Sequence, residues 1–358
     1  MKVIVLLRPS EKEVCFKMML AVLLVFGAVG LAELQSIHRN NVGSRSRFSN
    51  VSVIKDDLID QYINELAQRN DITEFKRILN PILVERVVGT ASHEEVKEYI
   101  VREMITLKWN VEQDSFHDVT PNRGKLLFTN VIATNNPSAS KFLVFACHYD
   151  SKLMNFKFIA ATDSAVPCAM LIYFAKVFNS LKKPIPSSIG LKFIFFDGEE
   201  AFVSWTATDS VYGARHLASQ MEARSNLNQI DLMVLLDLLG DSSPQFYSFF
   251  SNTHVQYLKL VTIEKRLKSK NLLASEKPPT RYFTGIKFFG ADIKDDHEPF
   301  LVKGVPVLHI IPHPFPNVWH TEFDNENIIN YDTVKNLLLI FEVFIVQYLT
   351  DAESSFPL

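Results

Sequence analysis

Five short apolar runs, separated by helix-like stretches, constrain the fold of this chain more than any other feature of its sequence. The runs are Leu126–Ala133, Phe142–Cys147, Leu191–Phe196, Leu232–Leu239 and Val305–Ile311. Runs of this length suit buried strands, and their alternation with helices is typical of parallel sheets covered on both faces. The sequence therefore predicts an α/β fold: a single domain with a central mixed, largely parallel sheet flanked by helices.

Two amphipathic helices are predicted ahead of these runs. Leu58, Tyr62 and Leu66 recur at helical spacing, and Ser92 with Glu95 forms a capping-box pattern before a second helix. The hydrophobic share of 47% excludes a disordered chain, and a net charge of −3 over 358 residues gives no electrostatic footprint for nucleic acid. We therefore expect a folded domain without a nucleic-acid partner.

The N-terminus has the layout of a secretory signal. Uncharged, mostly apolar residues fill Met18–Ala32, follow a basic stretch and end with small residues. We predict a signal peptide over 1–32, a polar segment over 33–53 and the main domain over 54–358. The sequon at Asn50 predicts glycosylation of a secreted protein in the secretory pathway. The alternative is an uncleaved signal-anchor that holds the protein in the Golgi membrane; after cleavage, no membrane contact is expected.

Polar residues stand where the predicted buried strands end. In open α/β sheets, sites lie outside the carboxyl ends of the strands, so we expect these side chains to converge on one crevice. Asp237 is the hardest to explain otherwise, because burying an unpaired carboxylate costs several kcal/mol and a cation is one of few remedies. Imidazole and carboxylate ligands without a thiolate suit Zn²⁺ at a catalytic site. The predicted set is His148, Asp163, Glu200, Asp237 and His320.

Glu199 directly precedes Glu200, and this adjacency suggests a division of roles. Successive side chains of an extended turn point in opposite directions. One glutamate can therefore bind the metal while its neighbour faces the substrate as a proton carrier. The residues by themselves favour a metalloenzyme and leave its chemistry open.

Eight motifs together resemble the glutaminyl-peptide cyclotransferases, or glutaminyl cyclases. They are ACHYDSK, ATDSAVPCAM, FIFFDGEEAF, DSVYGARHLA, LLDLLG, DDHEPFL, GVPVLHIIPHPFP and VWHT, in family order between about Ile54 and Leu349. HYDS or DGEEAF alone fits the wider zinc aminopeptidase clan, whereas ATDSAVPCA, DDHEPF and VWHT are more specific to cyclases. The resemblance implies a zinc exopeptidase-like fold. It also implies an acyltransferase that converts N-terminal glutamine, and more slowly glutamate, of peptides and proteins to pyroglutamate with release of ammonia.

The resemblance also implies roles for individual residues. One Zn²⁺ per chain would be held by Asp163, Glu200 and His320, and Glu199 matches the acid/base of the family. The other matches are hydrogen-bonded catalytic carboxylates (Asp237, Asp295), aromatic residues lining the substrate pocket (Trp205, Trp319) and an aromatic residue on its rim (Phe315). The expected partners are peptides or proteins with N-terminal glutamine, and the family favours a monomer.

Two other interpretations stay open. A two-zinc aminopeptidase of the same clan would use His148 and Asp237 as ligands, which a one-zinc cyclase does not. A non-catalytic ectodomain of this fold is the second alternative, although such relatives usually lose metal ligands and none is lost here. His313 and Glu298 depart from the family pattern, and at the rim of the pocket they would affect substrate preference rather than reaction type.

The chain has three cysteines, and an odd number needs an explanation in a secreted protein. Cys15 lies in the predicted leader, which leaves Cys147 and Cys168 as an even pair. The resemblance and the secretory context imply a disulfide between them, with two buried thiols as the alternative. Closing a loop of ~20 residues would contribute about 3 kcal/mol in the chain-entropy model.

Overall fold

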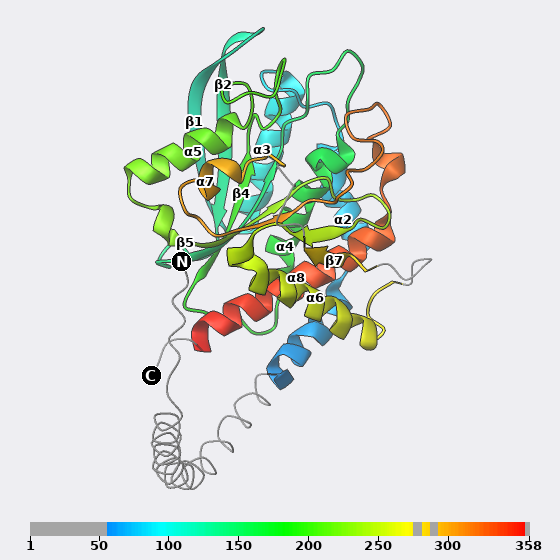
Figure 1. The fold of residues 1–358 in the computed structure, drawn as a ribbon. Coiled ribbons are helices and arrows are strands. Elements are labelled where there is room, and N and C mark those ends of the chain that lie inside the picture. The colour runs from blue at the N-terminus through cyan, green and yellow to red at the C-terminus, as the bar shows by residue number, and fades with distance from the viewer. Residues whose placement is uncertain (1–55, 275–280, 287–292, 355–358) are drawn as a thin grey trace, which may run out of the picture. The chain divides into compact units, whose positions relative to one another are not determined.

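The computed structural model describes residues 56–274, 281–286 and 293–354 (Figure 1). Contacts within the chain divide it into two compact units, 1–61 and 62–358. Of the first unit only residues 56–61 are described, and they are helical. The strands and pockets described below belong to the second unit.

Helices and strands alternate along the second unit, as the apolar runs predict. Its first described residues, 62–69, are helical. The helices that follow are α2 (Ile72–Leu79), α3 (Ala91–Thr106), α4 (Val166–Asn179), α5 (Tyr212–Ala223), α6 (His254–Ser269), α7 (Glu298–Leu301) and α8 (Tyr331–Ser354). The strands are β1 (Asn110–Thr120), β2 (Gly124–Thr134), β3 (Phe142–His148), β4 (Gly190–Phe196), β5 (Ile230–Leu236), β6 (Phe246–Ser248), β7 (Phe283–Ile286) and β8 (Val307–Ile310).

The main sheet is mixed and largely parallel, which confirms the predicted fold class. Among the described residues it has six strands in the order β1-β2-β4-β3-β5-β8. β4, β3, β5 and β8 run parallel, whereas β2 and β1 are added antiparallel at one edge. β6 and β7 pair separately in a small parallel sheet. The carboxyl ends of the four parallel strands therefore meet at one edge.

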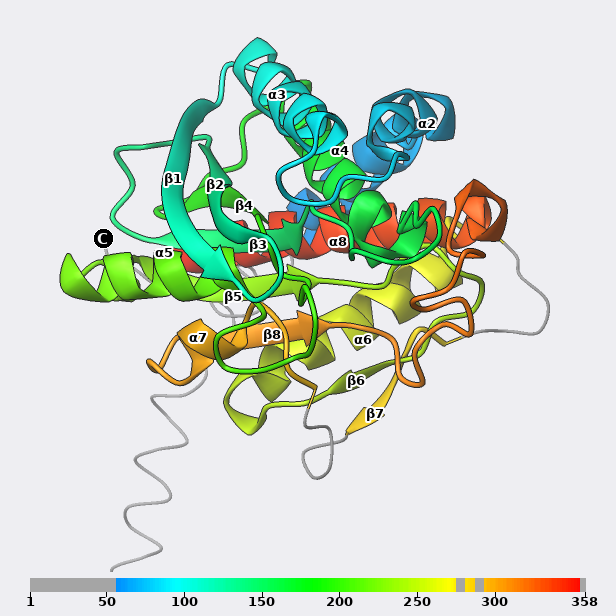
Figure 2. The same cartoon turned by 90° about the horizontal axis from the view of Figure 1, so that it is seen from above.

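Side chains of the parallel strands alternate between two apolar layers. Val144, Ile194 and Met233 face α5 and belong to one buried cluster with its side chains. On the other face, the ring of Phe145 lies 6.0 Å from Phe174 of α4 and 6.4 Å from Phe341 of α8. Helices thus cover both faces of the sheet (Figure 2). Truncating such a buried phenylalanine typically costs 3–5 kcal/mol, so we attribute much of the stability to these layers.

Two predicted element boundaries were wrong. The run Leu232–Leu239 does not continue as a strand, because β5 ends at Leu236 and Leu238 has a positive φ of 54°. The chain therefore turns away at Asp237. In α3 the N-cap is Thr90 rather than Ser92, since the Thr90 side chain accepts a hydrogen bond from His93 N at 3.3 Å.

Strand β1 was not predicted. It lies at the edge of the sheet, and most of its side chains are exposed or half-buried. Its sequence, NVEQDSFHDVT, is correspondingly polar. An edge strand that faces solvent carries little of the apolar signal by which buried strands are recognised.

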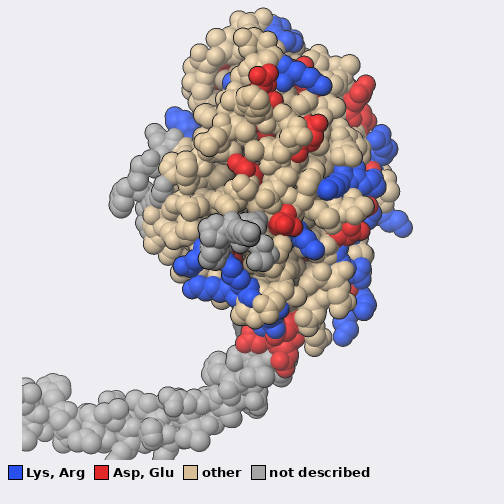
Figure 3. Space-filling view, turned by 90° about the vertical axis from the view of Figure 1, so that its right-hand side faces the viewer, with Lys and Arg blue, Asp and Glu red and all other residues tan. Residues whose placement is uncertain are grey.

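Two helical segments of the described part, Ala161–Asn179 and Tyr331–Glu353, are long and apolar enough to cross a membrane. The apolar window of each is 89% buried inside the protein, as in the core helices of soluble proteins. On the face drawn in Figure 3, acidic and basic side chains are interspersed among neutral ones. The charge on that face is therefore mixed rather than of one sign.

Candidate active site

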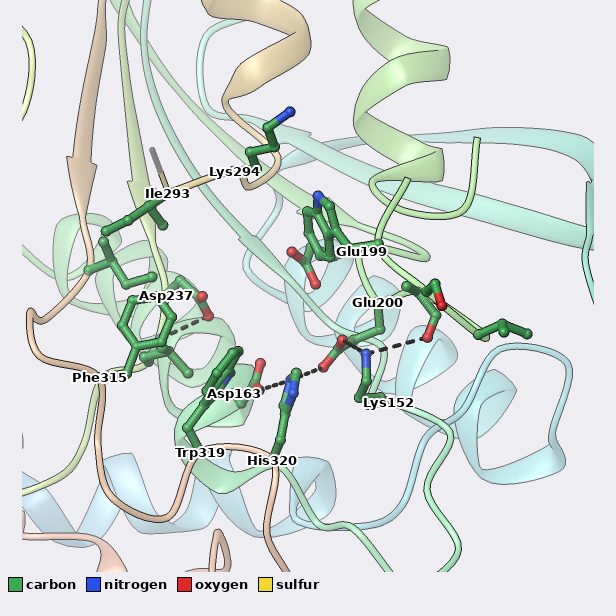
Figure 4. A pocket seen from close by; sticks show the side chains of 16 residues that line it. Lys152, Asp163, Glu199, Glu200, Asp237, Ile293, Lys294, Phe315, Trp319 and His320 are labelled. Carbon is green, nitrogen blue, oxygen red and sulfur yellow. Dashed lines mark hydrogen bonds and ion pairs between the residues drawn. The ribbon is translucent and has the colours of Figure 1, made fainter. Parts of the chain in front are cut away.

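A pocket of about 490 Å³ opens where the parallel strands end (Figure 4). His148 is the last residue of β3, Glu200 follows β4 and Asp237 follows β5. His320 lies in the loop after β8, and Asp163 lies in the turn that precedes α4. These side chains were predicted to converge on one crevice; four of them line the pocket, and His148 is buried beside Asp163 and Asp237.

Asp163, Glu200 and His320 form what we call the open group. Each offers a donor atom within 4.8 Å of the others. His320 Nε2 lies 3.2 Å from Glu200 Oε1 and 3.3 Å from Asp163 Oδ2, and Figure 4 shows the three side chains pointing toward one another. Asp163 Oδ2 is buried and accepts no hydrogen bond from any described residue. Two carboxylates and an imidazole with one carboxylate oxygen left open fit a zinc ion that keeps a position for substrate.

His148 and Asp237 form a second group with the same Asp163. His148 Nε2 lies 3.1 Å from Asp163 Oδ1 and 3.4 Å from Asp237 Oδ1. The other ring nitrogen of His148 lies 3.4 Å from Asp150 Oδ1. The five predicted donors therefore come together as two groups of three that share one carboxylate.

Asp150 fixes the turn that carries both glutamates. Its Oδ1 accepts from the backbone N–H of Glu199 at 3.1 Å, and its Oδ2 accepts from that of Glu200 at 3.2 Å. The turn leaves β4 through Gly198, whose φ is +66°. An added Cβ there would lie 2.5 Å from the Phe128 ring, so only glycine fits.

Glu199 lines the pocket and is 6% exposed. Burial raises the pKa of its carboxyl well above the ordinary value, and the nearby Glu200 and Asp295 raise it further against the opposing effect of His148. A raised pKa lets the carboxyl hold a proton at a higher pH than an ordinary glutamate does. That is the property required of a general acid and base.

Asp237 and Asp295 are buried carboxylates with opposite pKa shifts. Burial and the charge of Asp295 raise the pKa of Asp237 to about 6, and its Oδ1 accepts hydrogen bonds from Ser164 Oγ and from Leu238 N. Burial alone would also raise the pKa of Asp295, but a 2.7 Å hydrogen bond from His309 holds it below the ordinary value. Asp237 lines the pocket, whereas Asp295 does not and is only 2% exposed. Of the two carboxyls, Asp237 is therefore the one that more readily holds a proton.

The three predicted aromatic residues line the pocket. The Trp319 ring stacks on His320 at 4.2 Å and meets Phe315 edge-on at 4.9 Å. Trp205 and Trp319 are 39% and 41% exposed, so each presents a free face. Apolar walls around a few polar groups are typical of small-ligand pockets.

Comparisons with known proteins agree with this geometry. Residues 130–345 match peptidase family M28. The chain is 48% identical over 294 residues to the glutaminyl-peptide cyclotransferase of Drosophila melanogaster, with 80% of this chain and 83% of the relative covered. The chain belongs to the glutaminyl-peptide cyclotransferase family. The family member of Bos taurus is 41% identical over 309 residues, with 80% and 85% covered.

Solved structures place the fold within the same family. The glutaminyl cyclase of Macrostomum lignano superimposes with a TM-score of 0.75 at 40% identity, covering 80% of this chain and 92% of that one. A leucine aminopeptidase precursor from Bacteroides thetaiotaomicron has a TM-score of 0.63 at 17% identity, covering 78% and 97%, and shares the fold alone. Membership of family M28 and the buried donor groups point to a bound metal, and zinc fits the donors best.

Asp150 and three further described residues that contact the site were not predicted from the sequence. Lys152 donates to Glu200 Oε2 at 2.9 Å, Ser164 donates to Asp237, and His309 donates to Asp295. His309 interrupts an apolar strand in the same way as Asp237 interrupts its run. No local pattern distinguishes Lys152 or Ser164 from an ordinary loop residue.

The two departures from the family pattern lie away from the pocket wall. His313 packs edge-on against Tyr247, with ring centroids 6.3 Å apart, and its N–H donates to Gln245 O. Glu298 lines a neighbouring groove beside Lys294 rather than the pocket itself. Their predicted influence on substrate preference stays a prediction.

The two cysteines of the domain lie side by side under the site. Both are buried free thiols, with sulfur atoms 2.7 Å apart, and Cys168 Sγ donates to the His148 carbonyl at 3.0 Å. The pairing as a disulfide stays a prediction. Cys15, Asn50, the predicted leader and the polar segment lie outside the described residues.

Proposed function

We propose that this chain is a zinc-dependent glutaminyl cyclase that converts N-terminal glutamine of peptides and proteins, and more slowly glutamate, to pyroglutamate. The observation that carries the proposal is the juxtaposition of the open group with Glu199, a buried carboxyl whose pKa is raised, in one aromatic pocket. One Zn²⁺ per chain, held by Asp163, Glu200 and His320, would polarise the γ-carbonyl of the substrate and stabilise negative charge on its oxygen.

Glu199 acts as the proton carrier. The α-amine attacks the γ-carboxamide carbon, a new C–N bond closes the ring, and the bond to the amide nitrogen breaks. Glu199 takes a proton from the attacking amine and returns it to the departing nitrogen, so ammonia leaves as a neutral molecule. Because the reaction is intramolecular, the pocket contributes mainly by fixing the reacting geometry.

The neighbouring residues hold the amine and exclude water. Asp237 holds a proton more readily than Asp295 does, and the hydrogen bonds from Ser164 and His309 keep both carboxylates in place. Trp205, Trp319 and Phe315 cover the methylene stem of the glutamine side chain. Water kept out in this way cannot hydrolyse the amide to glutamate.

Incubation with a glutamine-initiated peptide and with an aminoacyl arylamide tests this function. A cyclase releases one ammonia per peptide and leaves the arylamide intact, and elemental analysis finds one zinc per chain. Glu199→Gln should lower kcat by 10²–10⁴-fold, which is the usual size of a general acid–base contribution, while zinc stays bound. Near-normal turnover by that variant would contradict the proton-carrier role.

A second candidate is a two-zinc aminopeptidase, favoured by the group of His148, Asp163 and Asp237. Against it, Asp237 Oδ1 already accepts hydrogen bonds from Ser164 and from Leu238 N. Cleavage of the arylamide with two zinc ions per chain would support this candidate over the cyclase.

We also propose that the chain enters the secretory pathway, that cleavage after Ala32 releases a monomer glycosylated at Asn50, and that residues 54–358 form the catalytic domain. The leader pattern and the sequon support this route. In the oxidising compartment Cys147 and Cys168 would form a disulfide. N-terminal sequencing, glycosidase treatment and thiol titration of the secreted protein test these three modifications. A retained leader would indicate a Golgi-anchored form instead.

A further inference from the structure

A groove of about 730 Å³ continues from the active-site pocket. Trp205 and Lys294 line both hollows, so the groove begins where the pocket ends. It runs between β1, α5 and α7, elements that none of the proposed catalytic residues occupies. Its volume lies within the 300–1,000 Å³ that ligand sites usually have.

The lining of this groove mixes apolar and aromatic side chains with charged side chains of both signs. Arg215 lies 3.6 Å from Asp118, and Lys294 lies 3.7 Å from Glu298. The side chains of both pairs are 30–50% exposed, so each pair contributes little and can open for a ligand. Val302 is 73% exposed on the groove wall. Such a surface suits a peptide chain better than it suits a small apolar molecule.

We propose that this groove binds the part of a peptide substrate that follows its N-terminal glutamine. The proposal rests on the proposed cyclase function and extends it to the substrate chain. With the γ-amide at the open group and the α-amine near Glu199, the rest of the peptide leaves the glutamine Cα on the Glu199 side. In the view of Figure 4, Lys294 lies above Glu199, and Asp163 and His320 lie below it. The chain therefore leaves past Lys294 and Trp205 into the groove.

A second hollow offers the alternative exit. It shares Leu238 and Phe315 with the pocket, has about half the volume at about 340 Å³, and is lined by several prolines. Ser242 is an exposed residue of its wall. Its smaller size and its place beside Phe315 rather than Glu199 favour the larger groove.

The experiment compares glutamine amide with a glutamine-initiated hexapeptide amide on full-length enzyme. Val302→Trp fills the groove without touching the pocket. We expect it to lower kcat/KM for the hexapeptide by about fivefold or more and to leave kcat/KM for glutamine amide within about twofold, since only the longer substrate reaches Val302. Ser219→Trp, at an exposed position of α5 on the opposite wall, should act in the same way.

Val255→Trp is the matched control, because Val255 is 66% exposed on α6 and lines none of the pocket, the groove or the second hollow. Unchanged hexapeptide turnover in both groove variants would overturn the proposal. So would an equal loss with both substrates, or a length-selective loss in Ser242→Trp instead. Failure of the wild type to cyclise either substrate would refute the proposed function itself, which is a different result.

Discussion

Two clusters of this protein offer the same kinds of metal donor, but they differ in their access to the pocket. The open group of Asp163, Glu200 and His320 borders the pocket, and its His320 side chain is 24% exposed. Asp295, His297 and His309, which we call the sealed group, also place donor atoms within 4.8 Å of one another. All three sealed residues are at most 3% exposed.

The difference lies in access to the pocket rather than in the identity of the donors. In the sealed group Asp295 accepts from His309 at 2.7 Å and from Asp296 N at 2.6 Å. Burial and the proximity of His309 lower the pKa of His297 to about 3, so its ring stays neutral. Each group keeps one buried atom without a hydrogen-bond partner among the described residues, Asp163 Oδ2 in the open group and His297 Nδ1 in the sealed group. The spacing of donors is therefore a weak criterion until their access to a pocket is considered.

Removing one histidine from each group tests which group binds the metal, and the largest effect is expected there. His320→Ala should abolish zinc binding and lower kcat/KM roughly 1,000-fold or more, because a Lewis acid supplies several kcal/mol of stabilisation. His297→Asn, the matched change in the sealed group, should leave zinc content unchanged. Elemental analysis with a cyclisation assay measures both. Zinc loss in His297→Asn would mean that the sealed group holds the metal.

His309→Leu tests whether the sealed group is a structural ion pair. The change leaves Asp295 buried without its partner, and we expect the free energy of unfolding to fall by about 3–5 kcal/mol while zinc stays bound. Denaturant unfolding measures the loss. His309→Leu combined with Asp295→Asn should recover part of it. An additive loss in the double variant would argue against the pairing.

Lys152 tests how much the open group depends on a neighbour. Its ammonium holds Glu200 Oε2, so Lys152→Met should weaken zinc binding by about 10–100-fold, as is usual when a ligand loses its outer hydrogen bond. Competition with a chelator measures the zinc Kd. Lys294→Met is the matched control, because Lys294 lines the same pocket without an ion pair to the open group. Equal Kd values in the two variants would contradict this role.

Glu342 differs from the carboxylates of both groups, because it is buried with neither a metal site nor a histidine. Both of its oxygens lack a hydrogen-bond partner among the described residues, and burial raises its pKa well above the ordinary value. The folded state therefore keeps a proton that the unfolded state loses, so stability falls as the pH rises above about 4.5, by up to roughly 1.4 kcal/mol per pH unit. Glu342→Gln should remove this slope in unfolding measurements at pH 5 to 8. An unchanged slope would show that Glu342 does not titrate in this way.

The sequence predicted the parallel strands of the core but not the edge strand β1, and the extent of burial explains both results. β3, β4 and β8 are buried on both faces, so their sequences are mostly apolar, and polar residues mark the ends of β3 and β4. β1 lies at the edge and alternates polar and half-buried residues, which resembles a loop.

The same limit applies to the site. Asp163, Glu200 and His320 were found because each stands in a motif, whereas the contact of Lys152 with Glu200 joins residues 48 positions apart. Such a contact depends on the packing of two loops, and no local spacing records it. His309 did carry a usable signal, a lone polar side chain in the buried strand β8. Applied to Asp237 alone, that criterion found one of the three residues Asp237, Asp295 and His309.

The two backbone hydrogen bonds to Asp150 have a consequence for protein engineering. Asp150 follows β3, whereas Glu199 and Glu200 follow the neighbouring β4. The orientation of the two glutamates is therefore set by a residue that follows a different strand. Copying DGEE into a new scaffold would transfer the two glutamates without Asp150, which orients them. The smallest portable unit of this site is a pair of adjacent parallel strands with both of their loops.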